Sequence, residues 1–265
     1  MNTANVFNRS LTLEEVRELA PAVFAPSADE RLSARYTFIP TNQVLAGLMN
    51  VGFVPVEVRQ ARTYRASPLH AAHTIRLRRR YEHISLRDSC PEIRLWNSHA
   101  GGQAYQARMS LWRAVCTNGL IVSRAAFPAV YVPHRGNVVG EVVTGALRLA
   151  ERFDVLAAQV ERMESRHLAK DEQLRFAERA LATRFADPAH CGILPSQLLT
   201  IRRSEDLGDD LFTVLNRAQE NLMRGGLTRR SESGRLTRTR RVTSLKEDVR
   251  VNSQLWDLAR EALAA

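Results

Sequence analysis

Arginine is the most frequent ionisable residue of this sequence and supplies 36 of its 38 lysine and arginine side chains. Residues 224–241 contain seven arginines and one glutamate, which gives a local net charge of +6 within a chain of net charge +10. Three glycines with several serines and threonines predict a loop here rather than a helix. Crowded like charges repel one another unless a partner neutralises them, which favours polyanion contact over a solvated loop. The predicted contacts are Arg229, Arg230, Arg235, Arg238, Arg240 and Arg241.

A second group of arginines follows a period of two. Between residues 73 and 80, apolar residues alternate with arginines, the pattern of a half-buried strand. The charged face is either the wet side of an antiparallel sheet or a surface that lies along a nucleic-acid backbone. Its arginines are Arg76, Arg78 and Arg80. The aromatic residues Tyr81, Trp96 and Tyr105 are candidates for stacking on bases, with burial in the core as the alternative.

A polar turn lies between these groups. Asn97, Ser98 and His99 precede an Ala-Gly-Gly sequence whose glycines allow positive φ. The turn is either purely structural or presents amides and polar side chains to phosphate. Arg108 and Arg113 could line the same groove. If residues 103–116 form a helix, Tyr105, Met109, Trp112 and Cys116 share its apolar face.

Other chemistries have weaker support. Asp88 and Glu92 resemble the carboxylate pair of a metal-dependent nuclease, but the usual neighbouring lysine is replaced by Arg94. His70 and His73 lack acidic or cysteine partners at metal-ligand spacing, and we predict no metal site. Cys116 with His99 and Asn97 has the residue types of a thiol hydrolase, a combination that most chains of this size offer by chance.

Nucleotide motifs are missing from the sequence. Neither of the two lysines, Lys170 and Lys246, follows a P-loop, and no dinucleotide fingerprint follows a strand. We therefore expect no catalytic residue, no cofactor and a non-enzymatic role. There is no apolar run of about 18 residues and no secretory signal pattern, so no membrane segment is expected. Three cysteines without a pairing pattern favour the cytoplasm.

The patterns predict an α+β fold. A twisted antiparallel sheet with helices should form the N-terminal half, with strands near 35–39, 53–64, 73–80, 93–95, 120–123 and 129–133. The C-terminal half should be mostly helical. Capping boxes at Thr12 and Ser244 open helices, and Thr41 caps another. A further helix is capped by Asp209 or Asp210 and ends at Gly225-Gly226. The expected organisation is 1–30 helix and linker, 31–136 sheet domain, 137–223 helical region, 224–243 basic loop and 244–265 C-terminal helix.

Residues 91–122 resemble the phage and plasmid-like proteins grouped as domain of unknown function 932. Those proteins similarly carry an Asn-Ser-His turn, an aromatic-rich segment and a Cys-Asn-Gly-Leu run, here Cys116 to Leu120 with one intervening residue. The resemblance extends over about residues 33–260. Ala100 departs from it, because an acidic residue is expected after the histidine. Further segments that fit the family are 33–56, 134–136, 221–226, 238–241 and 251–259.

The resemblance implies an accessory role on a mobile element. At the level of fold, the chain is also similar in outline to single-strand annealing proteins of the Red-beta and Erf type. The leading hypothesis is a homo-oligomeric protein that binds single-stranded DNA and anneals it without ATP. Two alternatives remain open: an inhibitor that binds a host defence complex, and a metal-dependent nuclease. The sequence does not distinguish DNA from RNA or give the oligomer size.

Overall fold

The chain folds into two compact units. Our computed structural model describes residues 10–33, 36–63, 67–80, 89–101, 104–113, 119–122, 129–132, 138–188, 190–231 and 234–264. The first unit comprises residues 1–114 and 127–154, and the second comprises 115–126 and 155–265. The later boundary, between residues 154 and 155, lies within the helix Phe153–Ser165 and not at residue 136. The helix Val138–Ala150 belongs to the first unit because it packs on the sheet.

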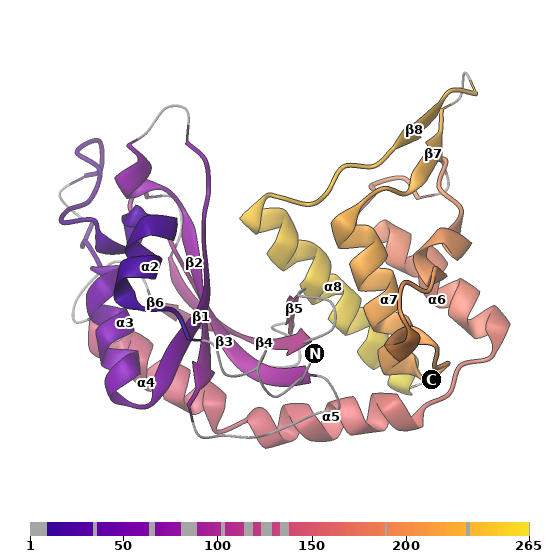
Figure 1. The fold of residues 1–265 in the computed structure, drawn as a ribbon, viewed down its shortest axis with the longest axis horizontal. Helices are drawn as coiled ribbons and strands as arrows, with labels where there is room; N and C mark the ends of the chain where they lie inside the picture. Colours follow the sequence, from indigo (N-terminus) through magenta and orange to yellow (C-terminus); the bar gives the residue numbers. More distant parts are fainter. Residues whose placement is uncertain are drawn as a thin grey trace. The chain divides into compact units, whose positions relative to one another are not determined.

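The first unit is an antiparallel sheet covered by helices on one face (Figure 1). The strand order is β1-β2-β3-β4, and β6 also pairs with β4. Figure 1 shows α2, α3 and α4 on the same side of these strands. The elements are α2 (Leu13–Leu19), α3 (Thr41–Asn50), β1 (Phe53–Gln60), β2 (His73–Arg79), β3 (Ser89–Asn97), β4 (Tyr105–Arg113), β6 (Val130–Val132) and α4 (Val138–Ala150).

Alternation of residue types explains which face the helices cover. Ile75 of β2 lies opposite Leu95 of β3, and Ile93 lies opposite Met109 of β4. All four side chains are essentially inaccessible, as are Val44 and Leu48 on α3. Residues at even positions of β2, β3 and β4 point to the other face, because successive side chains of a strand alternate. The α+β prediction is therefore confirmed.

Two predicted elements of this unit differ in the structure. Residues 36–39 form no strand: Ile39 is buried and the Tyr36 hydroxyl donates to the carbonyl of Ser98. The segment 105–113 is strand β4 and not part of a helix. Its apolar residues fit a period of two as well as a helical period, and the eight residue pairs that it forms with β3 decide between them.

A buried polar cluster joins α3 to the sheet. Thr41 was expected to cap α3, but Pro40 takes that position and the Thr41 hydroxyl points into the core. There it lies 3.0 Å from Nε2 of His73 and accepts from Nδ2 of Asn97 at 2.9 Å. Nδ1 of His73 lies 2.9 Å from the carbonyl of Ala71 and must donate to it. Burial lowers the pKa of His73 to about 4, so the ring is neutral at pH 7 and its Nε2 accepts from the Thr41 hydroxyl.

The second unit is built from helices around α7. Its elements are β5 (Gly119–Ile121), α5 (Phe153–Ser165, whose first two residues belong to the first unit), α6 (Lys170–Ala182), α7 (Leu211–Arg224), β7 (Thr228–Arg230), β8 (Leu236–Arg238) and α8 (Leu245–Ala264). Short 3-10 turns occur at Pro195–Leu199 and Ser204–Asp206. Residues 211–223 of α7 are all buried, and α6, α8 and the first 3-10 turn pack around them.

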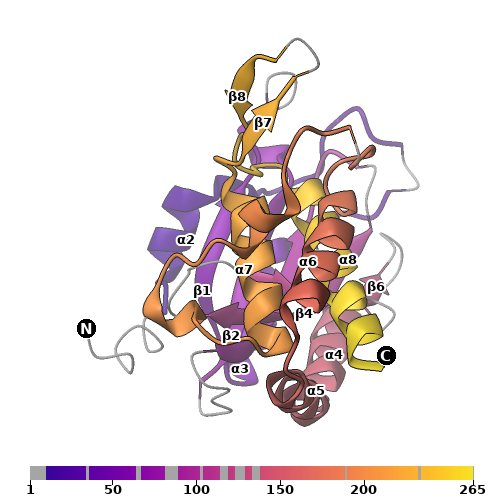
Figure 2. The ribbon, with the colours of Figure 1, turned by 90° about the vertical axis from the view of Figure 1, so that its right-hand side faces the viewer.

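The ends of α7 match their sequence signals. The carboxylate of Asp210 accepts from the backbone N–H of Thr213 at 2.9 Å, and Gly225 follows with a φ of 71°. Beyond Gly225, the predicted basic loop is instead a two-stranded ribbon in which β7 and β8 pair antiparallel. We call residues 228–238 the arginine hairpin. It projects beyond the helices of its own unit in both views (Figures 1 and 2).

Protonation of His73 should destabilise the fold. Burial lowers the pKa of His73 to about 4, whereas an unfolded histidine titrates near 6.5. The unfolded chain therefore binds more protons between these values. The free energy of unfolding should fall as pH drops from about 6.5 to 4, by up to about 1.4 kcal/mol per pH unit.

Urea unfolding at pH 7 and pH 5 tests this expectation. The His73→Gln variant should lose stability at pH 7 but should show a smaller difference between the two pH values than the original chain. An equal difference in both proteins would mean that other groups account for the pH dependence.

Candidate nucleic-acid interface

The arginine hairpin is fastened to its own unit along the outer edge of β7. The side-chain amide of Gln197 accepts from the Thr228 N–H at 2.7 Å and donates to the Thr228 carbonyl at 2.9 Å. The Arg230 N–H donates to the carbonyl of Gly192 at 2.9 Å. A Cβ at Gly192 would lie 2.0 Å from the Arg230 carbonyl oxygen, so only glycine permits this approach. The ribbon is thus held in place, although two strands alone are marginally stable.

The described residues that flank the turn of the hairpin are also hydrogen-bonded to one another. The Ser231 N–H donates to the carbonyl of Arg235 at 3.0 Å, and the Gly234 N–H donates to the carbonyl of Ser231 at 2.9 Å. Gly234 has a φ of 79°, a backbone conformation that glycine adopts readily. These bonds place Arg235 and Leu236 on a defined backbone.

All six predicted arginines of this region are exposed. Arg229, Arg230 and Arg238 lie on the strands, Arg235 lies beside the turn, and Arg240 and Arg241 follow β8. No ion pair or hydrogen bond of these six guanidiniums is found among the described residues. By contrast, Arg224 at the base of the hairpin pairs with Glu220 at 3.0 Å. The hairpin therefore concentrates positive charge that the described fold does not neutralise.

The second group of arginines lies on the sheet face opposite the helices. Arg76 of β2 is opposite Arg94 of β3, which in turn is opposite Arg108 of β4. We call these three residues the arginine row. Arg76 and Arg94 are only 5% and 4% exposed, so this face is not the wet side of a sheet. A row of three guanidiniums in such a setting requires anions or aromatic faces nearby.

Glu92 supplies the central negative charge of this face. Its fully buried carboxylate accepts from Nε of Arg76 at 2.6 Å and from the guanidinium of Arg78 at 2.7 Å. Arg76 also pairs with Glu57 at 2.5 Å. Burial alone would raise the pKa of Glu57, but Arg76, Arg94 and Arg59 lower it overall. Because Arg76 and Arg78 already pair with these carboxylates, their guanidiniums are less able to bind an external anion.

Aromatic rings complete the same face. The guanidinium of Arg78 lies 4.9 Å from the ring centre of Trp112, and that of Arg108 lies 5.7 Å from Tyr131. Arg108 also donates to the Tyr131 hydroxyl at 2.5 Å. Burial, followed by the charge of Glu92, raises the pKa of the nearby Cys90 thiol to about 12. Cys90 is therefore a protonated thiol at neutral pH and not a nucleophile.

Several predicted contacts are corrected by their positions. Arg113 is buried on the helix-covered side of β4, so it does not join the arginine row. Arg80 is exposed, but it lies in the turn after β2 and not on the strand face. Tyr105 is fully buried on the helix-covered side, where burial raises its pKa, and no ring face is accessible to a base. Trp96 is also buried, on the arginine side, and Tyr81 lies outside the described residues.

The Asn97–His99 turn points into the fold. Asn97 binds Thr41, and the ring of His99 packs 4.8 Å from that of Phe38 and 5.1 Å from that of His73. All three turn residues are buried, and the His99 carbonyl accepts from Asp29 N–H at 3.0 Å. These contacts favour the structural interpretation of the turn over phosphate binding.

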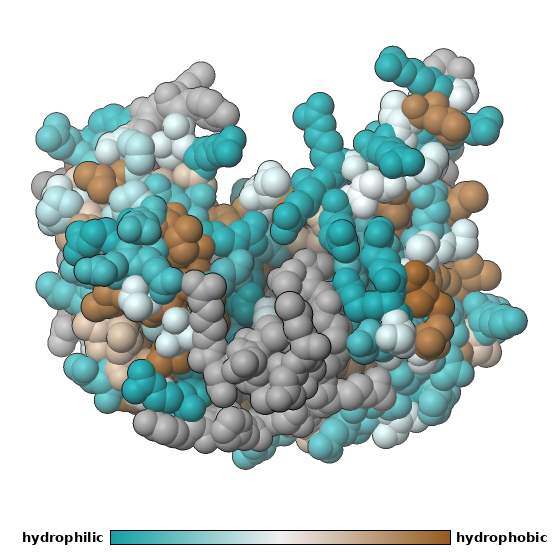
Figure 3. All heavy atoms as spheres, in the orientation of Figure 1, coloured by the Kyte–Doolittle hydropathy of each residue, from teal (hydrophilic) through white to brown (hydrophobic). Residues whose placement is uncertain are grey.

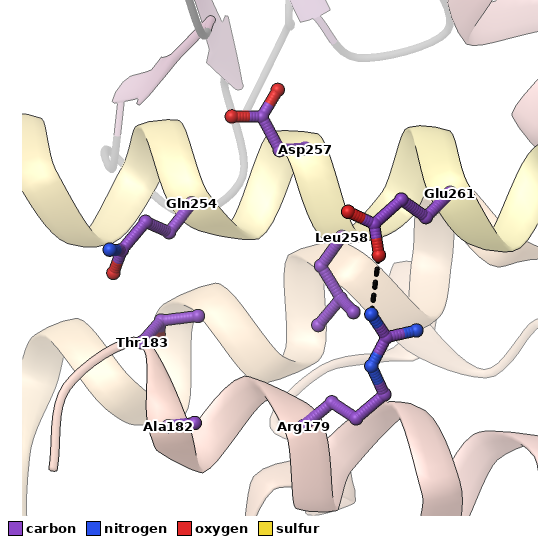
Figure 4. A pocket seen from close by; sticks show the side chains of 7 residues that line it. All are labelled: Arg179, Ala182, Thr183, Gln254, Asp257, Leu258 and Glu261. Carbon is purple, nitrogen blue, oxygen red and sulfur yellow. Dashed lines mark hydrogen bonds and ion pairs between the residues drawn. The ribbon is translucent and has the colours of Figure 1, made fainter. Parts of the chain in front are cut away.

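The described residues contain no other strong site. They include no group of three or more His, Cys, Asp or Glu side chains that could hold a metal ion, although Asp88 and Cys116 lie outside them. Of the helices described, none has the length and apolar character needed to cross a bilayer. A shallow hollow of about 380 Å³ lies between α6 and α8 (Figure 4). Arg179 pairs there with Glu261 and Asp257 lies nearby, so the hollow carries no excess positive charge.

Three residues that shape these surfaces were not predicted in these roles. Arg94 was noted only as the residue in place of a nuclease lysine, and strand pairing places it opposite Arg108. Tyr131 joins the same face through the pairing of β6 with β4. Gln197 supports the hairpin from a turn 31 residues away in sequence, and no local pattern marks it.

Comparison with known proteins identifies relatives over nearly the full chain. The family described as Domain of unknown function (DUF932) matches residues 29–256. The UPF0380 protein YafZ of Escherichia coli (strain K12) is 39% identical over 97% of this chain and 92% of its own length. The UPF0380 protein YfjQ of the same strain is 38% identical over 97% of this chain and 93% of its own length. No solved structure matches this chain.

The matched residues 29–256 agree with the resemblance predicted for residues 33–260. The alignments also cover more than nine tenths of the length of each relative. The chain therefore belongs to the Domain of unknown function (DUF932) family.

Proposed function

We propose that this chain is a nucleic-acid-binding protein of a mobile element, that its preferred ligand is single-stranded DNA, and that it acts in the cytoplasm without ATP. The observation that carries the proposal is the arginine hairpin, an anchored ribbon whose exposed guanidiniums have no acidic partner among the described residues. Arginine grips phosphate through a planar fork, and neutralising phosphates releases counterions.

The hairpin geometry suits contact with a backbone. Arg230 and Arg238 lie on one face of the ribbon and Arg229 lies on the other, because residues opposite each other in the register share a face. Guanidiniums on both faces can hold a phosphodiester chain that passes the ribbon. Contacts of this kind position the ligand and do not read its sequence. Bases would remain free to pair, as annealing requires.

Strand annealing also requires that many nucleotides be held together. One hairpin spans only a few residues, so we propose that several copies of the chain assemble along a strand. The arginine row contributes less in this proposal, because Arg76 and Arg78 already pair with Glu92.

The two alternatives receive less support. A protein that blocks a host defence complex by imitating DNA would need an acidic surface, and this chain has a net charge of +10. An inhibitor that uses the hairpin to bind an acidic protein surface remains compatible with the charge. A nuclease using Glu92 would need free carboxylate oxygens for a metal ion, and both oxygens accept from guanidiniums.

The first prediction concerns the salt dependence of binding. A triple variant with Arg229, Arg230 and Arg238 changed to Gln should bind a labelled single strand of about 40 nucleotides more weakly. The slope of log affinity against log salt should flatten by about 0.7 for each phosphate that the variant no longer neutralises. The measurement is a salt titration by fluorescence anisotropy without metal or ATP, alongside the matching duplex.

A matched control changes Arg162, Arg175 and Arg179 to Gln. These residues are exposed on α5 and α6 and their removal changes the net charge by the same amount. If both triple variants weaken binding equally, net charge and not the hairpin explains affinity. An original chain that does not bind at about 50 mM salt would overturn the proposed function, and tighter binding to the duplex would overturn the preference for single strands.

The second prediction separates the structural role of Glu92 from a catalytic one. Glu92→Gln should lower the free energy of unfolding by on the order of 3 kcal/mol, because the buried guanidinium of Arg76 and the partly buried guanidinium of Arg78 lose their shared carboxylate. Glu57→Gln should cost less than about 1 kcal/mol, since the Glu57 side chain is 35% exposed. Urea unfolding measures both. A Glu92→Gln variant of unchanged stability that loses magnesium-dependent cleavage of single strands would instead support the nuclease.

A further inference from the structure

Leu236 is an exposed apolar residue in the middle of the arginine hairpin. Its side chain is 60% exposed, whereas Leu227, just before β7, is 4% exposed and part of the core. Figure 3 shows the projecting ribbon as mostly hydrophilic with a hydrophobic patch among the polar side chains. A leucine in this position contributes little to the stability of the fold, because most of its surface remains in water.

The register defines what surrounds this leucine. Leu236 lies directly opposite Arg230, and Thr228 lies opposite Arg238. Paired residues share a face, and so do residues two apart on one strand, which are about 6.6–6.8 Å apart. One face of the ribbon therefore carries Thr228, Arg230, Leu236 and Arg238, and the apolar side chain is a direct neighbour of both arginines.

The backbone under Leu236 is defined by hydrogen bonds. The preceding residue, Arg235, accepts from the Ser231 N–H and donates its own N–H to the Ser231 hydroxyl at 3.1 Å. On the other strand, the Arg230 N–H is held by the Gly192 carbonyl. Leu236 is thus presented from an anchored support and not from a free loop end.

We propose that Leu236 inserts between bases of the nucleic acid that the hairpin holds, an inference that rests on the proposed function and extends it. Arginines on the same face would bind phosphates on either side, which brings the bases opposite the apolar side chain. Apolar side chains inserted between base steps partly unstack them. Because neighbouring bases of the bound single strand are already unstacked, less stacking energy has to be given up when the strand pairs with its complement.

Charge complementarity selects nucleic acid as the occupant of this face. A protein partner that covered Leu236 with an apolar surface would also bury Arg230 and Arg238, which would require carboxylates placed beside that surface. A phosphodiester chain supplies both features together, with anionic groups alternating with apolar base faces along its length. A second copy of this chain is a poorer fit, because it would bring the same arginines together.

The test uses the full chain and a 40-nucleotide single strand that contains 2-aminopurine, whose fluorescence rises when it is unstacked. The original chain should increase the fluorescence on binding. Leu236→Ala should remove this increase while the salt slope of binding stays unchanged and the Kd rises by no more than about ten-fold. Leu194→Ala, which changes another exposed leucine of the same unit, should behave like the original chain.

Each other result has a distinct meaning. Binding by the original chain without a fluorescence increase, or an equal increase with Leu236→Ala, would overturn the insertion of Leu236 but not the proposed function. Failure of the original chain itself to bind the single strand would overturn both. If Leu236→Ala changes the oligomeric state in size-exclusion chromatography and has no effect on unstacking, Leu236 is a subunit contact and the inference is wrong.

Discussion

Attachment of the β7 edge is the constraint on which the proposed interface depends. Two strands that carry exposed arginines cannot hold themselves together in water, because they bury little apolar surface and their charges repel. Gly192 and Gln197 compensate by hydrogen-bonding to the outer edge of β7, and the absence of a side chain at Gly192 makes the close approach possible. Without these contacts the same arginines would sit on a segment of no defined shape.

Arginines in this chain serve two different purposes. Some stabilise the fold: Arg76 and Arg78 neutralise Glu92, Arg203 pairs with Glu220 at 2.6 Å, and Arg184 donates to the carbonyls of Leu222 and Arg240 near the hairpin base. Others, on and beside the hairpin, have no such partner among the described residues. The number of arginines therefore does not indicate nucleic-acid affinity, because some of the arginines are paired with buried carboxylates of the fold.

The residue types of a motif can suggest a binding role, whereas its position in the fold indicates a structural one. The residue types of the Asn-Ser-His turn allowed either a structural turn or an anion site, and in the structure Asn97 and His99 lie in a buried cluster with Thr41 and His73. Polar side chains of this kind specify how a helix sits on a sheet, because each buried donor must find its acceptor. The residues that make the turn recognisable are thus explained by the requirements of the fold.

Local signals in the sequence were enough to predict the α+β class, the ends of α2 and α7, the start of α8 and the strands β1 to β3, because capping and alternation depend on neighbouring residues alone. The sequence also identified the family and the concentration of charge in residues 224–241. Pairing between distant segments was needed to show that 105–113 is a strand, that Arg94 joins Arg76 and Arg108, and that the basic segment is an anchored hairpin. Those features arise from hydrogen bonds between segments far apart in sequence, such as Gln197 with Thr228, and such pairings leave no periodic trace in either segment alone.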